Sequence, residues 1–256
     1  MINMIREFFG IGGYQRPAEG FLSWQHLTFV TFLMAVMTLT AVFLGRRNRN
    51  RGEQAKNRVL IIAALLLDVI EITKIVLMCI LGDDPMHWQH ELPLFLCSIQ
   101  LIALPVAAFS RGRMKDAALD FVCMFGILGA ILGTYGAGNN YSCYPVLSFD
   151  NVVSGITHSI SGFASLYIMI SGMAGLRVKN LPITCGIIAF FCVAAYAANI
   201  LLDCNYMFLM RGDGTPYDIL YALVSGHKVI YPALVVGLFF VYIAVCYGVK
   251  ALVKRR

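Results

Sequence analysis

The sequence predicts an all-α membrane protein, a polytopic bundle of about seven transmembrane helices in a single domain that covers residues 1–256. Of the 256 residues, 59% are hydrophobic and 13% are charged, and the mean hydropathy is +0.74. A soluble domain is about half apolar and about a quarter charged. The additional hydrophobic residues are concentrated in long apolar runs. This composition excludes a soluble enzyme, a secreted disulfide scaffold and a disordered regulator.

Each apolar run has about the 20-residue length that a helix needs to cross the hydrocarbon core. We expect spans at 24–45, 59–81, 92–110, 117–136, 151–175, 181–202 and 229–250. Helices are expected because lipid offers no hydrogen-bond partner to an unpaired backbone. The stretch 217–228 is moderately apolar, and it is either an interfacial helix or the beginning of the last span.

The distribution of basic residues predicts the orientation of the chain. Fifteen of the 20 Lys and Arg residues fall in the connections on one side, at 46–58, 111–115, 177–179 and 250–256. Only Arg6, Arg16, Arg211 and Lys228 fall on the other side. Cytoplasmic connections carry such an excess of positive charge. We therefore expect the N-terminus outside and the C-terminus in the cytoplasm.

The second expected span contains the charged residues Asp68, Glu71 and Lys74, three residues apart. This spacing places them along one ridge of a helix. Charges at membrane depth are costly and usually face a partner or a cavity. One interpretation is an internal ion pair that joins two helices. The other is the polar wall of a binding site.

Two reactive side chains are expected at similar depth below the outer surface. His158 lies eight residues after Asp150, about 12 Å down a helix, and Cys97 lies six residues after Glu91, about 9 Å down. Taken alone, His158 is most simply a histidine that is hydrogen-bonded between helices, and Cys97 a small apolar filler. A thiol beside an imidazole, however, can become a thiolate and attack an ester carbonyl.

Three further patterns have ordinary structural explanations. The outer segment GDDPMHWQHE, with His87 and His90, could bind zinc if it formed a helix, but Pro85 argues against that. A stripe of glycines, Gly126, Gly129 and Gly133, is explained by close helix packing. The outer cysteines, which are Cys143 and Cys204, could form a disulfide if they are neighbours.

Polar residues gather at the outer end of the sixth span. They are Asn199, Asp203, Asn205 and Tyr206. These side chains could bind lipid headgroups or cap the helix. The following RGDGTP is predicted to form a turn because of its glycines and its proline.

Several short motifs occur in an order that resembles a known family. They are LPLFLC (92–97), the histidine at 158, NYMFL (205–209) followed by GTP, and YP (231–232). With these motifs, residues 24–250 resemble the bacterial YwaF-like integral membrane family, which is related to the vertebrate transmembrane protein 164 acyltransferase. In plan the chain is also similar, more distantly, to intramembrane hydrolases of fatty-acid esters of hydroxy fatty acids.

The resemblance implies roles for two residues. The last residue of LPLFLC is Cys97, which would be the acyl-accepting nucleophile, and His158 would be its base. The distant hydrolases use threonine as the nucleophile, so the chemistry can differ between branches. The resemblance also implies a multi-pass protein of the bacterial cytoplasmic membrane.

The sequence therefore predicts a lipid acyltransferase or esterase that acts on phospholipids or fatty-acid esters. Glu71, Asp68, Lys74, Asn199, Asp203, Asn205 and Tyr206 are expected to bind substrate or support the site. Membrane lipids are the expected partners, with no cofactor, metal ion, nucleic acid or soluble protein implied. The alternatives are a proton-coupled transporter or lipid-binding protein that uses Asp68, Glu71, Lys74 and His158 as a relay, and a structural membrane component.

Overall fold

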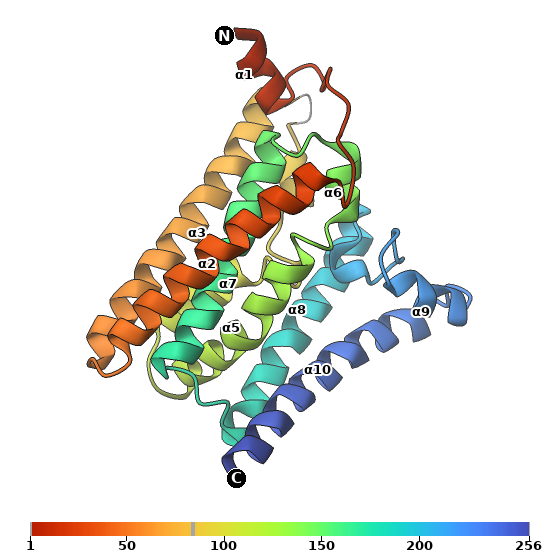
Figure 1. Ribbon diagram of the computed structural model, residues 1–256. Coiled ribbons are helices and arrows are strands. Elements are labelled where there is room, and N and C mark those ends of the chain that lie inside the picture. The colour runs from red at the N-terminus through yellow and green to blue at the C-terminus, as the bar shows by residue number, and fades with distance from the viewer. Residues whose placement is uncertain (1, 83–84, 256) are drawn as a thin grey trace.

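The fold is a bundle of helices, seen in a computed structural model that describes residues 2–82 and 85–255 (Figure 1). Within those ranges there is no β-strand. The α-helices are α1 (Ile2–Phe9), α2 (Trp24–Asn48), α3 (Glu53–Leu81), α4 (Gln100–Phe109), α5 (Gly112–Leu132), α6 (Gly138–Cys143), α7 (Phe149–Ser171), α8 (Leu181–Leu202), α9 (Tyr217–Leu223) and α10 (Ile230–Arg255). Three short 3-10 helices are η1 (His87–His90), η2 (Val178–Asn180) and η3 (Tyr206–Phe208).

Local signals in the sequence set the ends of the central helices. The side chain of Ser23 accepts a hydrogen bond from the backbone N–H of His26 and so caps α2. Ser148 caps α7 in the same way, through the N–H of Asn151. Both serines satisfy a donor that the first helical turn leaves free. Gly172 ends α7 with a φ of 75°, a left-handed conformation that glycine adopts without steric cost.

Four helical segments in the described part of the chain are long and apolar enough to cross a membrane. They are Trp24–Asn48, Phe149–Ser171, Val178–Leu202 and Ile230–Leu252. The helices α3 and α5 have the length to span but carry more charge, including Glu71 and Asp120. The chain is thus a multi-pass membrane protein.

The expected third span differs from the structure. A helix was predicted over 92–110, but α4 begins only at Gln100 and has 10 residues. At 1.5 Å per residue it is about 15 Å long, half the thickness of the hydrocarbon core. Residues 92–99 form a series of turns instead. Non-helical backbone is tolerated at membrane depth where protein surrounds it or where it lines a polar cavity.

Small residues let three central helices approach one another closely. A Cβ atom on Gly162 of α7 would lie 2.4 Å from the sulfur of Met37 on α2 and 2.7 Å from Cβ of Ala130 on α5. A Cβ atom on Gly126 would lie 2.6 Å from the carbonyl oxygen of Ser161. The packing interpretation of the glycine stripe therefore holds at Gly126, where α5 meets α7.

The outward surface of the bundle is apolar. On α2, Phe32, Leu39 and Phe43 are each more than 60% exposed. Exposed apolar side chains along a membrane-length helix are positioned to contact lipid chains.

The C-terminal third forms a separate pair of helices, α8 and α10, beside the central group (Figure 1). The stretch 217–228 is not continuous with the last span, because α9 ends at Leu223 and α10 begins at Ile230. The α2–α3 and α7–α8 connections lie at the same end of the bundle as the C-terminus, opposite the N-terminus (Figure 1).

Candidate functional site

A polar cavity of about 240 Å³ lies among α3, α7 and the segment that leads into α4. Its lining combines apolar, charged and nucleophilic side chains: Leu67, Glu71, Lys74, His90, Glu91, Phe95, Cys97, Ser98, Gln100, Leu101, Asn140, Asp150, Ser154, Thr157, His158 and Ser161. The turns at 92–99, which replace the expected helix, contribute to this lining. The irregular backbone thus coincides with the polar cavity.

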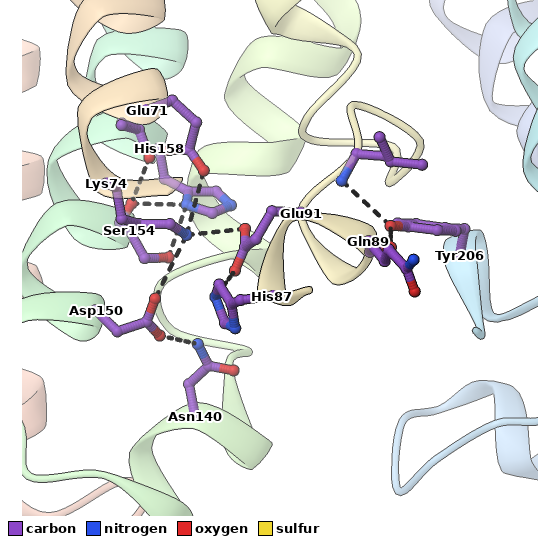
Figure 2. Close-up of polar contacts among 12 residues, drawn as sticks. Glu71, Lys74, His87, Gln89, Glu91, Asn140, Asp150, Ser154, His158 and Tyr206 are labelled. Atoms are coloured by element: carbon purple, nitrogen blue, oxygen red, sulfur yellow. Dashed lines mark hydrogen bonds and ion pairs between the residues drawn. The ribbon is translucent and has the colours of Figure 1, made fainter. Parts of the chain in front are cut away.

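Lys74 joins three segments of the chain through three carboxylates (Figure 2). Its Nζ lies 3.2 Å from Glu71 on the same helix, 2.9 Å from Glu91 beside η1, and 3.4 Å from Asp150 at the start of α7. The side chain of Lys74 is only 6% exposed. A buried ammonium needs such partners to offset its desolvation. Lys74 and Glu71 therefore form an internal ion pair and also line the cavity.

The outer rim of this cluster contains a histidine–carboxylate pair. Nε2 of His87 lies 3.2 Å from Oε1 of Glu91 (Figure 2). This contact with Glu91 raises the pKa of His87, although partial burial of the ring opposes it. Burial acts to raise the pKa of Glu91, but its contacts with His87 and Lys74 lower that pKa below its usual range. Glu91 is therefore ionised, and it links the rim to Lys74.

Cys97 lies in the turns directly before α4, with its backbone close to α5. A Cβ atom on Gly129 would lie 3.2 Å from Cβ of Cys97. Glycine at this position leaves room for the cysteine. α4 begins three residues further along the chain.

His158 projects from α7 toward the end of α5. Its Nδ1 lies 2.7 Å from the carbonyl oxygen of Ser154 (Figure 2). Because a carbonyl oxygen only accepts, Nδ1 of the neutral ring carries the proton and donates to it. Nε2 is then the basic nitrogen. A Cβ atom on Gly133 would lie 2.0 Å from this Nε2, so the glycine provides the space that the ring occupies.

The structure places the predicted site residues in two groups. Cys97, His158, Glu71 and Lys74 line the cavity, whereas Asp68 does not. Oδ1 of Asp68 is buried and has no hydrogen-bond partner within the described ranges.

The polar residues at the end of α8 also lie outside the cavity lining and contact this chain's own backbone. Nδ2 of Asn199 donates to the Tyr206 carbonyl at 3.0 Å, and Oδ1 accepts from the Tyr206 N–H at 2.6 Å. Asn205 donates to the Asp213 carboxylate at 2.8 Å. Asp203 is the C-terminal cap of α8, with a φ of 54°. Asn199 and Asn205 therefore bind other parts of this chain, and Asp203 ends α8 through its left-handed backbone.

Tyr206 connects this region to the site. Its hydroxyl donates to the carbonyl oxygen of Gln89 and accepts from the N–H of Leu92 at 3.2 Å (Figure 2). Its ring packs against Phe95 with 4.9 Å between ring centroids. Tyr206 therefore holds both ends of the segment that precedes Cys97.

The metal and disulfide alternatives find no counterpart in the described residues. No group of three or more His, Cys, Asp or Glu side chains there is arranged to hold a metal ion. Two acids of the segment GDDPMHWQHE, Asp83 and Asp84, lie outside the described residues. Cys143 and Cys204, which both lie within them, are free thiols, and Cys204 contacts Nδ1 of His90 at 3.5 Å.

Sequence reasoning assigned only Cys97, His158, Glu71 and Lys74 of the lining to the site, and it missed three polar residues that matter to its chemistry. Asp150 served only as a marker of the membrane surface, Glu91 served as such a marker and as part of the possible zinc pattern, and Gln100 was not singled out. The signal for the two acids was Lys74 itself, because a buried ammonium needs counter-charges from neighbouring elements. Gln100 carried no such signal, because its burial depends on the packing of α4.

Comparison with known proteins identifies the family to which the chain belongs. No curated protein and no solved structure matches the chain. The model of the TMEM164 family matches residues 21–249, a range that contains the cavity, Cys97 and His158. A match over nearly the whole chain shows that this multi-pass membrane protein belongs to the TMEM164 family.

Proposed function

We propose that the protein is a lipid acyltransferase or lipid esterase of the cell membrane that uses Cys97 as nucleophile and His158 as base. The observation that carries the proposal is that these two side chains, from different elements, line one polar cavity. Nε2 of His158 is the nitrogen that can take the thiol proton.

The proposed reaction begins when Nε2 of His158 removes the thiol proton of Cys97. The thiolate attacks the acyl carbonyl carbon of an ester, and the carbon–sulfur bond forms. The ester carbon–oxygen bond then breaks, and the leaving alkoxide takes the proton from His158. His158 then takes the proton of a second hydroxyl, which belongs to a lyso-lipid in a transferase and to water in an esterase. The hydroxyl oxygen forms a bond to the acyl carbon, the carbon–sulfur bond breaks, and the Cys97 thiolate takes the proton back from His158.

The charged rim supports the same proposal. On the predicted orientation, Asp150 at the start of α7 lies toward the outer surface, and His158, eight residues further along the same helix, lies about 12 Å deeper. This order matches a lipid whose headgroup contacts the rim while its ester bonds reach the thiol. A carrier that uses Asp68, Glu71, Lys74 and His158 as a relay has less support, because Asp68 lies outside the lining.

The test is acylation of the purified protein in vesicles that contain a phospholipid with an alkyne-labelled acyl chain. We expect a hydroxylamine-sensitive acyl group on Cys97 and, when lyso-lipid is added, labelled diacyl product. Cys97→Ala and His158→Gln should lose both signals. Cys185→Ala, which removes a thiol on α8 outside the cavity, should retain them.

Two results would count against the proposal. Equal labelling of the wild type and Cys97→Ala would exclude the thioester. Proton-coupled flux into empty vesicles that is lost in Glu71→Gln, with no acylation of the wild type, would favour the carrier.

A further inference from the structure

Gln100 is a buried polar residue in the cavity lining with an unused hydrogen-bonding side chain. It is the first residue of α4 and is 1% exposed. Neither Nε2 nor Oε1 has a hydrogen-bond partner among the residues that the structure describes. Exchange of the two amide atoms would not change this, since both are unpartnered. Leaving a buried amide unpaired is costly, so the group calls for an explanation.

The position of Gln100 relative to Cys97 follows from the backbone. The N–H of Gln100 donates to the carbonyl oxygen of Cys97 at 3.2 Å, which closes a 3-10-type turn. In such a turn the side chains at positions i and i+3 lie on the same side. Both side chains line the cavity. The amide is therefore on the same side of the turn as the thiol.

Three other neutral side chains of the lining, those of Thr157, Ser161 and Asn140, already donate to acceptors within the chain. Oγ1 of Thr157 donates to the Ser154 carbonyl at 3.1 Å, and Oγ of Ser161 donates to the Thr157 carbonyl at 3.1 Å. Nδ2 of Asn140 donates to Asp150 at 3.3 Å. Gln100 thus has two N–H donors without an acceptor in the described part of the lining.

We infer that Gln100 is a further catalytic residue whose Nε2 donates a hydrogen bond to the acyl carbonyl oxygen under attack by Cys97. The inference rests on the proposed function. When the carbon–sulfur bond forms, the carbonyl π electrons move to oxygen, and the Nε2–H group stabilises this oxyanion. When the electrons return, the ester carbon–oxygen bond breaks and the hydrogen bond weakens. The amide neither gains nor loses a proton.

The inference is tested by comparing two reactions of the same thiol. Acylation by p-nitrophenyl octanoate in detergent micelles passes through an oxyanion, whereas alkylation by iodoacetamide needs only the thiolate. We expect Gln100→Met to lower the acylation rate constant about 100- to 1,000-fold, as the loss of an oxyanion donor does. Gln100→Glu, which keeps the size but replaces the amide with a carboxylate, should be at least as slow. Alkylation of Cys97 should not change in Gln100→Met, whereas the carboxylate of Gln100→Glu lies on the same side of the turn as the thiol, disfavours the thiolate and should slow alkylation as well.

Gln54→Leu, which alters an exposed glutamine at the start of α3, is the control and should leave both rates unchanged. Equal losses of acylation and alkylation in both Gln100 variants would show that Gln100 only holds the cysteine in place, and would overturn the inference. Unchanged acylation would also overturn it, while leaving the Cys97–His158 proposal intact. If no ester acylates the wild type, the proposed function and this inference both fail.

Discussion

Gly133 lies where any larger residue would collide with the ring of His158. The glycine directly follows α5, and a Cβ atom there would lie 2.0 Å from both Cδ2 and Nε2 of the imidazole. The next glycine back along α5, Gly129, stands against Cys97. The two glycines are four residues apart and share a helix face. Two of the three glycines in the stripe, Gly129 and Gly133, therefore make room for the side chains of Cys97 and His158.

Gly133→Ala should displace His158 without removing it. A Cβ atom cannot remain 2.0 Å from a ring, so the imidazole or α5 must move. We expect thioester formation on Cys97 to fall at least about 100-fold, as it does when a general base is lost. Gly186→Ala on α8 is the matched control, because nothing lies within 4 Å of its Cβ position. Full activity in Gly133→Ala would contradict the role of His158.

Lys74→Met should destabilise the fold strongly. The substitution leaves Glu71, Glu91 and Asp150 close together without their shared cation. Breaking a buried ion pair from one side costs about 3–5 kcal/mol. The measurement is the free energy of unfolding in mixed micelles. Arg47→Met, at an exposed position on α2, is the control for loss of one charge. A cost of only about 1 kcal/mol, as for an exposed pair, would show that Lys74 does not join these elements.

The His87–Glu91 pair should make stability depend on pH. The pKa of His87 is raised in the folded protein by Glu91, so the pair contributes fully below about pH 6.5, the ordinary pKa of histidine. The contribution is lost as the pH rises through the folded-state pKa. Glu91 stays ionised over this range because its pKa is lowered.

We therefore expect His87→Gln to lower the Tm relative to the wild type at about pH 5.5 and to have little effect at about pH 8.5. In a Glu91→Gln background the same substitution should lose this pH dependence, which a double-mutant cycle measures. A Tm difference that is equal at both pH values would show that His87 contributes through packing alone.

Tyr206→Phe should loosen the segment that precedes Cys97. The substitution removes the acceptor for the Leu92 N–H and the donor to the Gln89 carbonyl. Backbone groups left unpaired in a buried site cost about 1–3 kcal/mol. We expect lower stability and slower acylation of Cys97. Tyr144→Phe, at a position that is 40% exposed, should change neither property. Slower acylation with unchanged stability would instead place the hydroxyl in the reaction.

The sequence predicted the helices well where one apolar run forms one straight element, as in α2 and α8. It predicted the wrong structure for 92–99, because hydropathy reports the environment of a segment and not its backbone path. LPLFLC is apolar enough for a span, yet its backbone is held by the Tyr206 hydroxyl, 114 residues from Leu92 in the chain. No local pattern encodes a partner so distant.

The amino-acid sequence by itself determined the class of the protein, because hydropathy and the placement of basic residues act segment by segment. It also made Cys97 and His158 candidates, since depth along a helix can be counted. Only the tertiary structure decided which polar residues meet. It brought Glu91 and Asp150 to Lys74, left Asp68 outside the cavity and turned Gln100 to the same side as Cys97. Those contacts depend on how the helices rotate and pack against one another, and a single segment does not carry that information.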